Sequence, residues 1–190
     1  MPVIREPGMR PVHMGDMRAE IAAERNGTLY IRSQVPLAAY PDRITDCLDR
    51  WAADAPDRVF LADRGGDGGW RAVSYAEARS KARALAQSLI ELGLSAERPI
   101  AVLSGNDVEH GLLTLAAFYA GIPIAPISPA YSLVSSDLAK LRYVLDLVTP
   151  GLVFADDGAR FARAFDVVAH DATLLVGRNP VAGRRCLPFD

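Results

Sequence analysis

Cysteine and lysine are scarce in this sequence, and each scarcity excludes a class of site. The 190 residues include two cysteines, Cys47 and Cys186, with no CxxC or Cys/His spacing. Neither a disulfide framework nor a zinc site is therefore expected, and we predict no metal site and a reducing, cytoplasmic location. The two lysines, Lys81 and Lys140, fall within helix-like segments among surface-type residues, so we interpret both as solvated helix positions.

Long apolar runs and charge runs of one sign are also missing. No apolar run reaches about 18 residues, so no membrane-spanning helix is expected. Residues 1–27 lack the apolar centre of a signal peptide, and we predict a flexible leader there. Lys plus Arg number 21 and Asp plus Glu 23, without clustering, which argues against nucleic-acid partners. Small polar molecules remain as candidate partners.

The hydrophobic residues, half of the total, are spaced as in an α/β fold. Residues 28–33 alternate like a strand, a helix pattern starts at Ile44, and residues 58–63 and 70–73 flank a glycine-rich turn as a β-hairpin would. From Pro99 onward, apolar strands alternate with helices. The strands are expected at 99–104, 122–127, 151–155 and 173–177, and the helices at 108–120, 137–148 and 159–168. This order indicates a mostly parallel sheet with helices on both faces, following an antiparallel hairpin.

Local signals set the ends of several elements. The sequence SYAE at Ser74 to Glu77 is a capping box, which predicts that a helix starts there, and Gly93 suits its C-terminal cap. Pro123 and Pro126 cannot donate to a sheet ladder, so we expect their short strand at an edge of the sheet. A loop is expected over residues 128–133, followed by a helix with a serine at position 135 or 136 as its N-cap.

Two loops have the composition of a ligand site. The loop GGDGG, residues 65–69, could cradle a phosphate, but Trp70 opens a strand directly after it, which favours a hairpin turn. SGND, residues 104–107, joins a strand end to a helix start, where open α/β folds commonly bind ligands. A turn followed by a helix cap accounts for the same four residues, and it is the favoured interpretation.

No side chain has the neighbours that catalysis requires. His110 has no nucleophile or carboxylate at a recognisable spacing, and neither His13 nor His170 adds to a constellation. Tyr131 could line a cleft or anchor a loop. The serines at positions 128, 132, 135 and 136 lie outside any GxSxG motif. We therefore assign no catalytic, cofactor-binding or metal-binding residue.

Two stretches in order along the chain carry a family resemblance. VSYAEARSKARALAQSLIELGL, residues 73–94, and LAAFYAGIPIAPISPAYSL, residues 115–133, resemble the first two core motifs of the acyl-adenylate-forming (AMP-binding) superfamily. DRWAADAPDRVFLADR, GGWRAVSYAEA, SGNDVEH and SPAYSL are most similar to its feruloyl-CoA synthetase branch. The resemblance covers residues 28–161. It implies that residues 28–190 are an incomplete N-terminal part of the large domain of a ligase.

The resemblance also implies a reaction and its cofactors. Members of the family join a carboxylic acid to ATP, with magnesium at the phosphates, and then transfer the acyl group to CoA, releasing AMP and pyrophosphate. Their Ser/Thr/Gly-rich phosphate loop ending in lysine, and the second lysine of a small C-terminal domain, have no counterpart in these 190 residues. A fragment of an aromatic acid-CoA ligase is thus the first hypothesis. A free-standing Rossmann-like or flavodoxin-like binding module is the alternative, and an inactive truncated product is a third.

Overall fold

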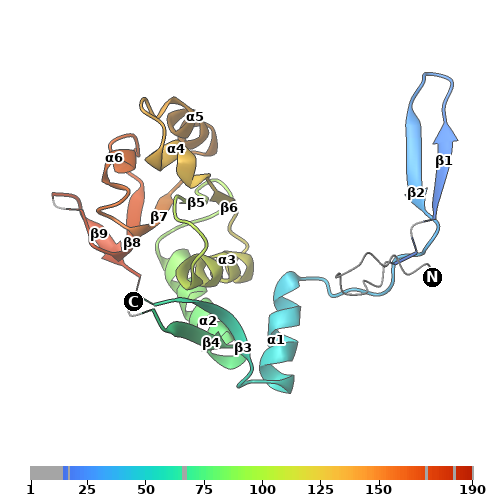
Figure 1. The fold of residues 1–190 in the computed structure, drawn as a ribbon, viewed down its shortest axis with the longest axis horizontal. Coiled ribbons are helices and arrows are strands. Elements are labelled where there is room, and N and C mark those ends of the chain that lie inside the picture. Colours follow the sequence, from blue (N-terminus) through green and yellow to red (C-terminus); the bar gives the residue numbers. More distant parts are fainter. Residues whose placement is uncertain (1–14, 17, 66–67, 170, 182, 190) are drawn as a thin grey trace, which may run out of the picture. The chain divides into compact units, whose positions relative to one another are not determined.

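A computed structural model describes residues 15–16, 18–65, 68–169, 171–181 and 183–189 (Figure 1). The chain divides into two compact units, Met1–Pro41 and Asp42–Asp190, which are treated separately below. Two histidines considered above, His13 and His170, lie outside the described residues, as do positions 66 and 67 of the glycine-rich loop.

The first unit contains an antiparallel hairpin. β1 (Ala19–Ala23) pairs with β2 (Leu29–Ser33), and Ile21 lies opposite Ile31. β2 confirms the strand expected at residues 28–33. β1 falls within residues 1–27, the segment expected to be a flexible leader, and all five of its residues are exposed. Its sequence, AEIAA, has one large apolar side chain, so alternation alone does not reveal it. The boundary of the leader at residue 27 stays a prediction.

The second unit opens with a helix and a second hairpin. α1 (Ile44–Asp54) precedes β3 (Val59–Arg64) and β4 (Trp70–Ser74), which pair antiparallel as expected. In the connecting loop, the Gly65 N–H donates to the Gly69 carbonyl over 2.9 Å, and the Gly68 N–H donates to the Gly65 carbonyl over 3.0 Å. Because these two donors are used within the loop, the structure favours the hairpin turn over a phosphate cradle.

The capping box starts the next helix at the expected residue. α2 (Tyr75–Glu91) has Ser74 as its N-cap: the Glu77 N–H donates to Ser74 Oγ over 3.3 Å, and the Ser74 N–H donates to the Glu77 carboxylate over 2.8 Å. Gly93 follows with φ of +70°, a conformation that glycine adopts without steric cost. Leu92, one residue beyond the helix, is 38% exposed.

Five parallel strands form the main sheet in the order β6-β5-β7-β8-β9. The strands are β5 (Ile100–Val102), β6 (Ile124–Pro126), β7 (Leu152–Asp157), β8 (Thr173–Arg178) and β9 (Cys186–Pro188). β6 lies at one edge, which confirms the placement predicted from its prolines. β9 is not among the strands expected from the sequence, since three residues that include a proline give no strand pattern.

The helices after β5 differ in part from the prediction. α3 (Val108–Ala120) spans the expected residues, whereas α4 (Pro129–Leu133) replaces an expected loop and α6 (Ala162–Phe165) is shorter than expected. α5 (Ala139–Val148) starts after Leu138 rather than after a serine cap. Ser135 still contributes, because the Leu138 N–H donates to its hydroxyl over 3.2 Å.

Alternate residues of the sheet enter two separate cores. Val102 and Phe154 pack with residues of α2 and α3, whereas Leu103 and Ala155 pack with residues of α5 and α6 on the other face. Figure 1 shows these helices on opposite sides of the strands. The α/β fold with a mostly parallel sheet and helices on both faces is therefore confirmed.

Candidate functional site

The carboxyl ends of β5 and β7 form the point where the chain leaves the sheet in two directions. α3, which follows β5, packs on one face, and α6, which follows β7, packs on the other. Open α/β sheets bind ligands at such points, because the diverging connections leave a crevice between adjacent strands. Ser104 follows β5, and Asp156 lies near the end of β7. The segment SGND therefore lies where the sequence analysis placed it.

A polar cavity of about 310 Å³ opens at this edge of the sheet. Four carboxylates and three guanidinium groups line it. They belong to Asp63, Asp107, Glu109 and Asp156, and to Arg64, Arg71 and Arg178. Arg71 joins the hairpin to α3: its guanidinium donates to Asp63 over 3.0 and 2.6 Å and also pairs with Glu109. Hydrogen bonding from Arg71 holds the pKa of Asp63 below its usual range.

One residue of SGND, Asp107, is the N-cap of α3. The His110 N–H donates to Asp107 Oδ1 over 2.7 Å, and Asp63 receives a further bond of 3.0 Å from the Val108 N–H. The His110 ring donates from Nδ1 to the Gly105 carbonyl over 2.9 Å, which fixes the turn. The favoured interpretation of SGND as a turn and cap is thus confirmed. Burial raises the pKa of Asp107, and the neighbouring charge of Asp156 raises it further.

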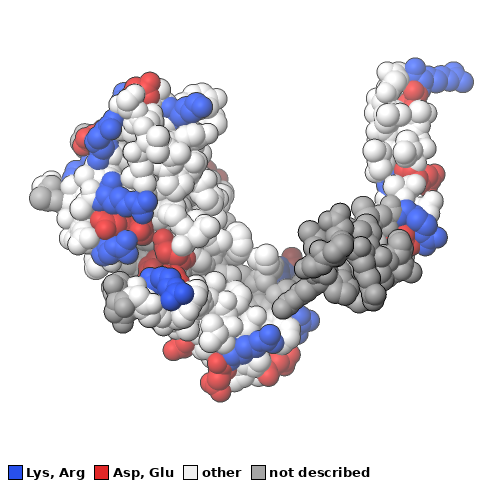
Figure 2. Space-filling view, in the orientation of Figure 1, with Lys and Arg blue, Asp and Glu red and all other residues white. Residues whose placement is uncertain are grey.

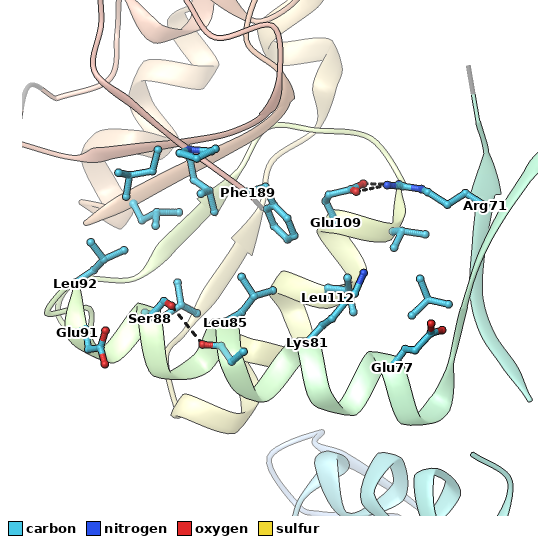
Figure 3. A pocket seen from close by; sticks show the side chains of 18 of the residues that line it. Arg71, Glu77, Lys81, Leu85, Ser88, Glu91, Leu92, Glu109, Leu112 and Phe189 are labelled. Carbon is cyan, nitrogen blue, oxygen red and sulfur yellow. Dashed lines mark hydrogen bonds and ion pairs between the residues drawn. The ribbon is translucent and has the colours of Figure 1, made fainter. Parts of the chain in front are cut away.

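An apolar groove of about 780 Å³ lies beside the polar cavity. Figure 3 shows its walls: Leu85 of α2 and Leu112 of α3 lie near Phe189. The Arg71–Glu109 ion pair lies at one end, and Leu92, just beyond α2, lies at the other. Arg71, Glu109 and Phe189 line both spaces. A volume of this size could hold an organic molecule, with charged groups at one end and hydrocarbon along its length.

The two lysines lie in different surroundings. Lys81 is exposed on α2 and lines the apolar groove, one turn from Glu77 (Figure 3). Lys140 is exposed on α5, with its ammonium group 5.6 Å from the centre of the Tyr131 ring. Tyr131 packs against the core on the α5 face, as a loop anchor would. The position of Lys81 in a cavity wall was not anticipated, because helical spacing does not show what faces a helix.

Neither metal clusters nor single-sign patches dominate the described surface. Figure 2 shows basic and acidic side chains interspersed on the visible face of the second unit. Within the described ranges, no group of three His, Cys, Asp or Glu residues is placed to hold a metal ion. Over the same residues, no helix has the length and hydropathy that a membrane crossing requires.

Sheet order, helix placement and the crevice at β5 and β7 define an open α/β protein of the doubly wound class. The model of one family, described as AMP-binding enzyme, matches residues 48–189. The chain therefore belongs to the AMP-binding enzyme family. The resemblance seen in the sequence is confirmed at this level, and the feruloyl-CoA synthetase branch stays a prediction.

Similar proteins differ in what they are described as doing. A probable non-canonical nonribosomal peptide synthetase, CymA, from Salinispora arenicola is 31% identical over 119 residues, which is 63% of this chain and 1% of that protein. A putative long-chain-fatty-acid CoA ligase from Rhodopseudomonas palustris matches 77% of this chain with a TM-score of 0.61 and 23% identity. A fatty acyl-adenylate ligase from L. pneumophila matches 60% with a TM-score of 0.53 and 18% identity.

The chain is much shorter than these similar proteins. It covers 35% of the R. palustris ligase and 20% of the L. pneumophila ligase. At such identities the two structures establish the fold alone.

Sequence reasoning missed the residues that complete the polar cavity. Asp156 and Arg178 converge through the pairing of β7 with β8. Arg71, on the separate β3–β4 hairpin, reaches the cavity through its ion pair with Glu109 of α3. A signal for one of them was present: two acidic residues, Asp156 and Asp157, end the apolar run LVFA, as ligand-binding carboxylates at strand ends commonly do.

Proposed function

We propose that this chain supplies the N-terminal part of the large domain of an ATP-dependent acid-thiol ligase. The reaction joins a carboxylic acid to ATP, forming an acyl-adenylate and pyrophosphate, and CoA then displaces AMP to give a thioester. The observation that carries the proposal is the match to the AMP-binding enzyme family over residues 48–189. Adenylation makes chemical sense because AMP is a far better leaving group than the oxygen of a free carboxylate.

The proposed acid is aromatic, with ferulate as the first candidate. Support comes from the sequence motifs, of which SGNDVEH and SPAYSL are most similar to feruloyl-CoA synthetases. The apolar groove and its aromatic Phe189 show that this unit presents hydrocarbon next to charged groups, but the acid is proposed on the motifs and not on the groove.

The described residues contribute scaffold to this reaction. Their carboxylates are not clustered to hold magnesium, so no step is assigned to a metal within this chain. In the described part of the glycine-rich loop, the N–H groups of Gly65 and Gly68 bind carbonyls of the same loop. Asp63, Arg71 and Glu109 instead hold the hairpin on the first turn of α3, which keeps the edge of the sheet in a fixed geometry.

Pyrophosphate exchange tests the proposal. The protein is expressed from its complete gene and incubated with ATP, labelled pyrophosphate and one acid at a time, which is ferulate, benzoate or a fatty acid. CoA is then added, and the acyl-CoA formed is measured. We expect exchange that depends on the acid, and a thioester with CoA. Absence of exchange with every acid contradicts the ligase. Exchange without a thioester contradicts the CoA step alone. The 190-residue chain by itself is expected to show no exchange, because its sequence has no Ser/Thr/Gly-rich loop ending in lysine.

A further inference from the structure

Three buried oxygen atoms at the carboxyl edge of the sheet have no hydrogen-bond partner. They are Ser104 Oγ, Asp107 Oδ2 and Asp156 Oδ1. Ser104 is 4% exposed and Asp156 is 9% exposed. Buried polar atoms in native proteins almost always have a partner, since water no longer solvates them. Three such atoms at one edge of a sheet therefore point to a group that binds there.

Strand register brings two of these oxygens together. Val102 lies opposite Phe154, and the Leu103 N–H donates to the Phe154 carbonyl over 2.9 Å. Ser104 and Asp156 each come two residues after this pair. Ser104, just beyond the end of β5, therefore lies beside Asp156 of β7 and on the same face of the sheet. This face is the one that α3 covers, and Asp107 is the N-cap of α3. Asp107 and Asp156 line the same cavity of about 310 Å³, which places the third oxygen at this edge as well.

Each of the three arginines that line the cavity already has a partner, and Arg64 donates to the Gly68 carbonyl over 3.0 Å. Arg71 binds Asp63 and Glu109. Arg178 donates over 3.1 Å to Asp156 Oδ2, which leaves Oδ1 of the same carboxylate unpaired, and it also binds Asp157. No cationic side chain among the described residues pairs with Asp107. In the wall of the cavity, carboxylates outnumber guanidinium groups by one, and the three oxygen atoms at this edge have no hydrogen-bond donor.

The cavity of about 310 Å³ gives access to this edge. Asp107 and Asp156 are part of its wall, together with Arg178. The Arg178 side chain is 63% exposed, and ion pairs of such exposed groups are weak. The Arg178–Asp156 ion pair therefore holds the guanidinium only weakly over this part of the cavity.

We propose that the edge between β5 and β7 binds an ammonium group through Ser104, Asp107 and Asp156. An ammonium group carries one positive charge on a compact centre, and its three N–H donors match three acceptor oxygens. A metal ion fits less well, because the described residues lack a cluster of three carboxylate, imidazole or thiolate ligands. The group is either a free ammonium ion or the primary ammonium of a small molecule, and this binding goes beyond the proposed ligase reaction.

Urea denaturation of the chain at constant ionic strength tests the proposal. The probes are the chlorides of ammonium, ethylammonium, tetramethylammonium, sodium and magnesium. At an ammonium concentration ten times its dissociation constant, the folding equilibrium constant should rise about elevenfold relative to sodium, and the effect should saturate. Tetramethylammonium has no N–H donor and should behave like sodium. Stabilisation by ethylammonium alone assigns the site to a primary ammonium, whereas stabilisation by ammonium alone assigns it to the free ion.

Variants separate this site from general salt effects. Asp107→Asn retains a good N-cap but removes the charge, and Asp156→Asn removes the second charge, so each should abolish the ammonium effect. Asp146→Asn, on the exposed side of α5, is the matched control and should retain it. The proposal is overturned if ammonium and ethylammonium stabilise the fold no more than sodium does, or if tetramethylammonium or magnesium stabilises it as much as ammonium does. It is also overturned if ammonium stabilises the Asp107→Asn variant as much as the wild type.

Discussion

Replacing Arg71 by methionine should loosen the attachment of the β3–β4 hairpin to α3. The change removes the guanidinium that joins Asp63 to Glu109 and leaves two carboxylates facing each other. A hydrogen bond to a charged group contributes about 1.5–3 kcal/mol, whereas an exposed ion pair contributes about 0–1 kcal/mol. The Arg71 side chain is 47% exposed and its two partners are each 19% exposed. We therefore expect a loss of about 1–2 kcal/mol in the free energy of unfolding, between these limits.

Urea denaturation measures this loss. With a slope of about 2 kcal/mol per molar urea, the midpoint should fall by about 0.5–1 M at pH 7. Arg142→Met is the control, because Arg142 is exposed on α5, and its midpoint should stay within about 0.25 M of the wild type.

The pH dependence of the loss follows from Asp63. Its pKa in the folded state is lowered, mainly by Arg71, so its ionisation stabilises the fold above the unfolded value of about 4. That stabilisation disappears as the pH falls through the lowered pKa. The difference between wild type and Arg71→Met should be constant from about pH 7 to 5 and should shrink below about pH 4. A midpoint change under about 0.25 M at pH 7, or a deficit of equal size at pH 3, would refute the reasoning.

Two further predictions concern the helix cap and the groove. Ser74→Ala should lower the free energy of unfolding by about 1 kcal/mol in the same urea assay, because the Glu77 N–H loses its acceptor. Ser74→Asn should stay near the wild type, because asparagine is also a good N-cap. Equal losses in the two variants would contradict the capping role. An apolar fluorescent dye should bind the native protein in the groove, and Leu92→Glu should reduce its fluorescence. Leu147→Glu, which changes an exposed leucine of α5, should leave the dye fluorescence unchanged. A similar decrease in both variants would show that the dye binds outside the groove.

The confirmed parts of the fold rest on contacts between near neighbours in the chain. Ser74 and Glu77 are three residues apart and cap each other, so the start of α2 can be read from four letters. Gly121 ends α3 with φ of +69°, where glycine is favoured over other residues. The prolines of β6 predicted an edge strand, because a missing N–H is a property of the residue itself.

What the sequence by itself determined is therefore the class of fold, the ends of its main helices and the family resemblance. The tertiary structure alone decided that Ser104, just after β5, and Asp156 of β7 lie at the same edge of the sheet although 52 positions separate them. It also decided that Arg71 reaches Glu109 across 38 positions. β9 likewise exists as a strand only through its pairing with β8. The physical reason is that register and burial depend on contacts between distant segments, and no local pattern of residues encodes which of those segments will meet.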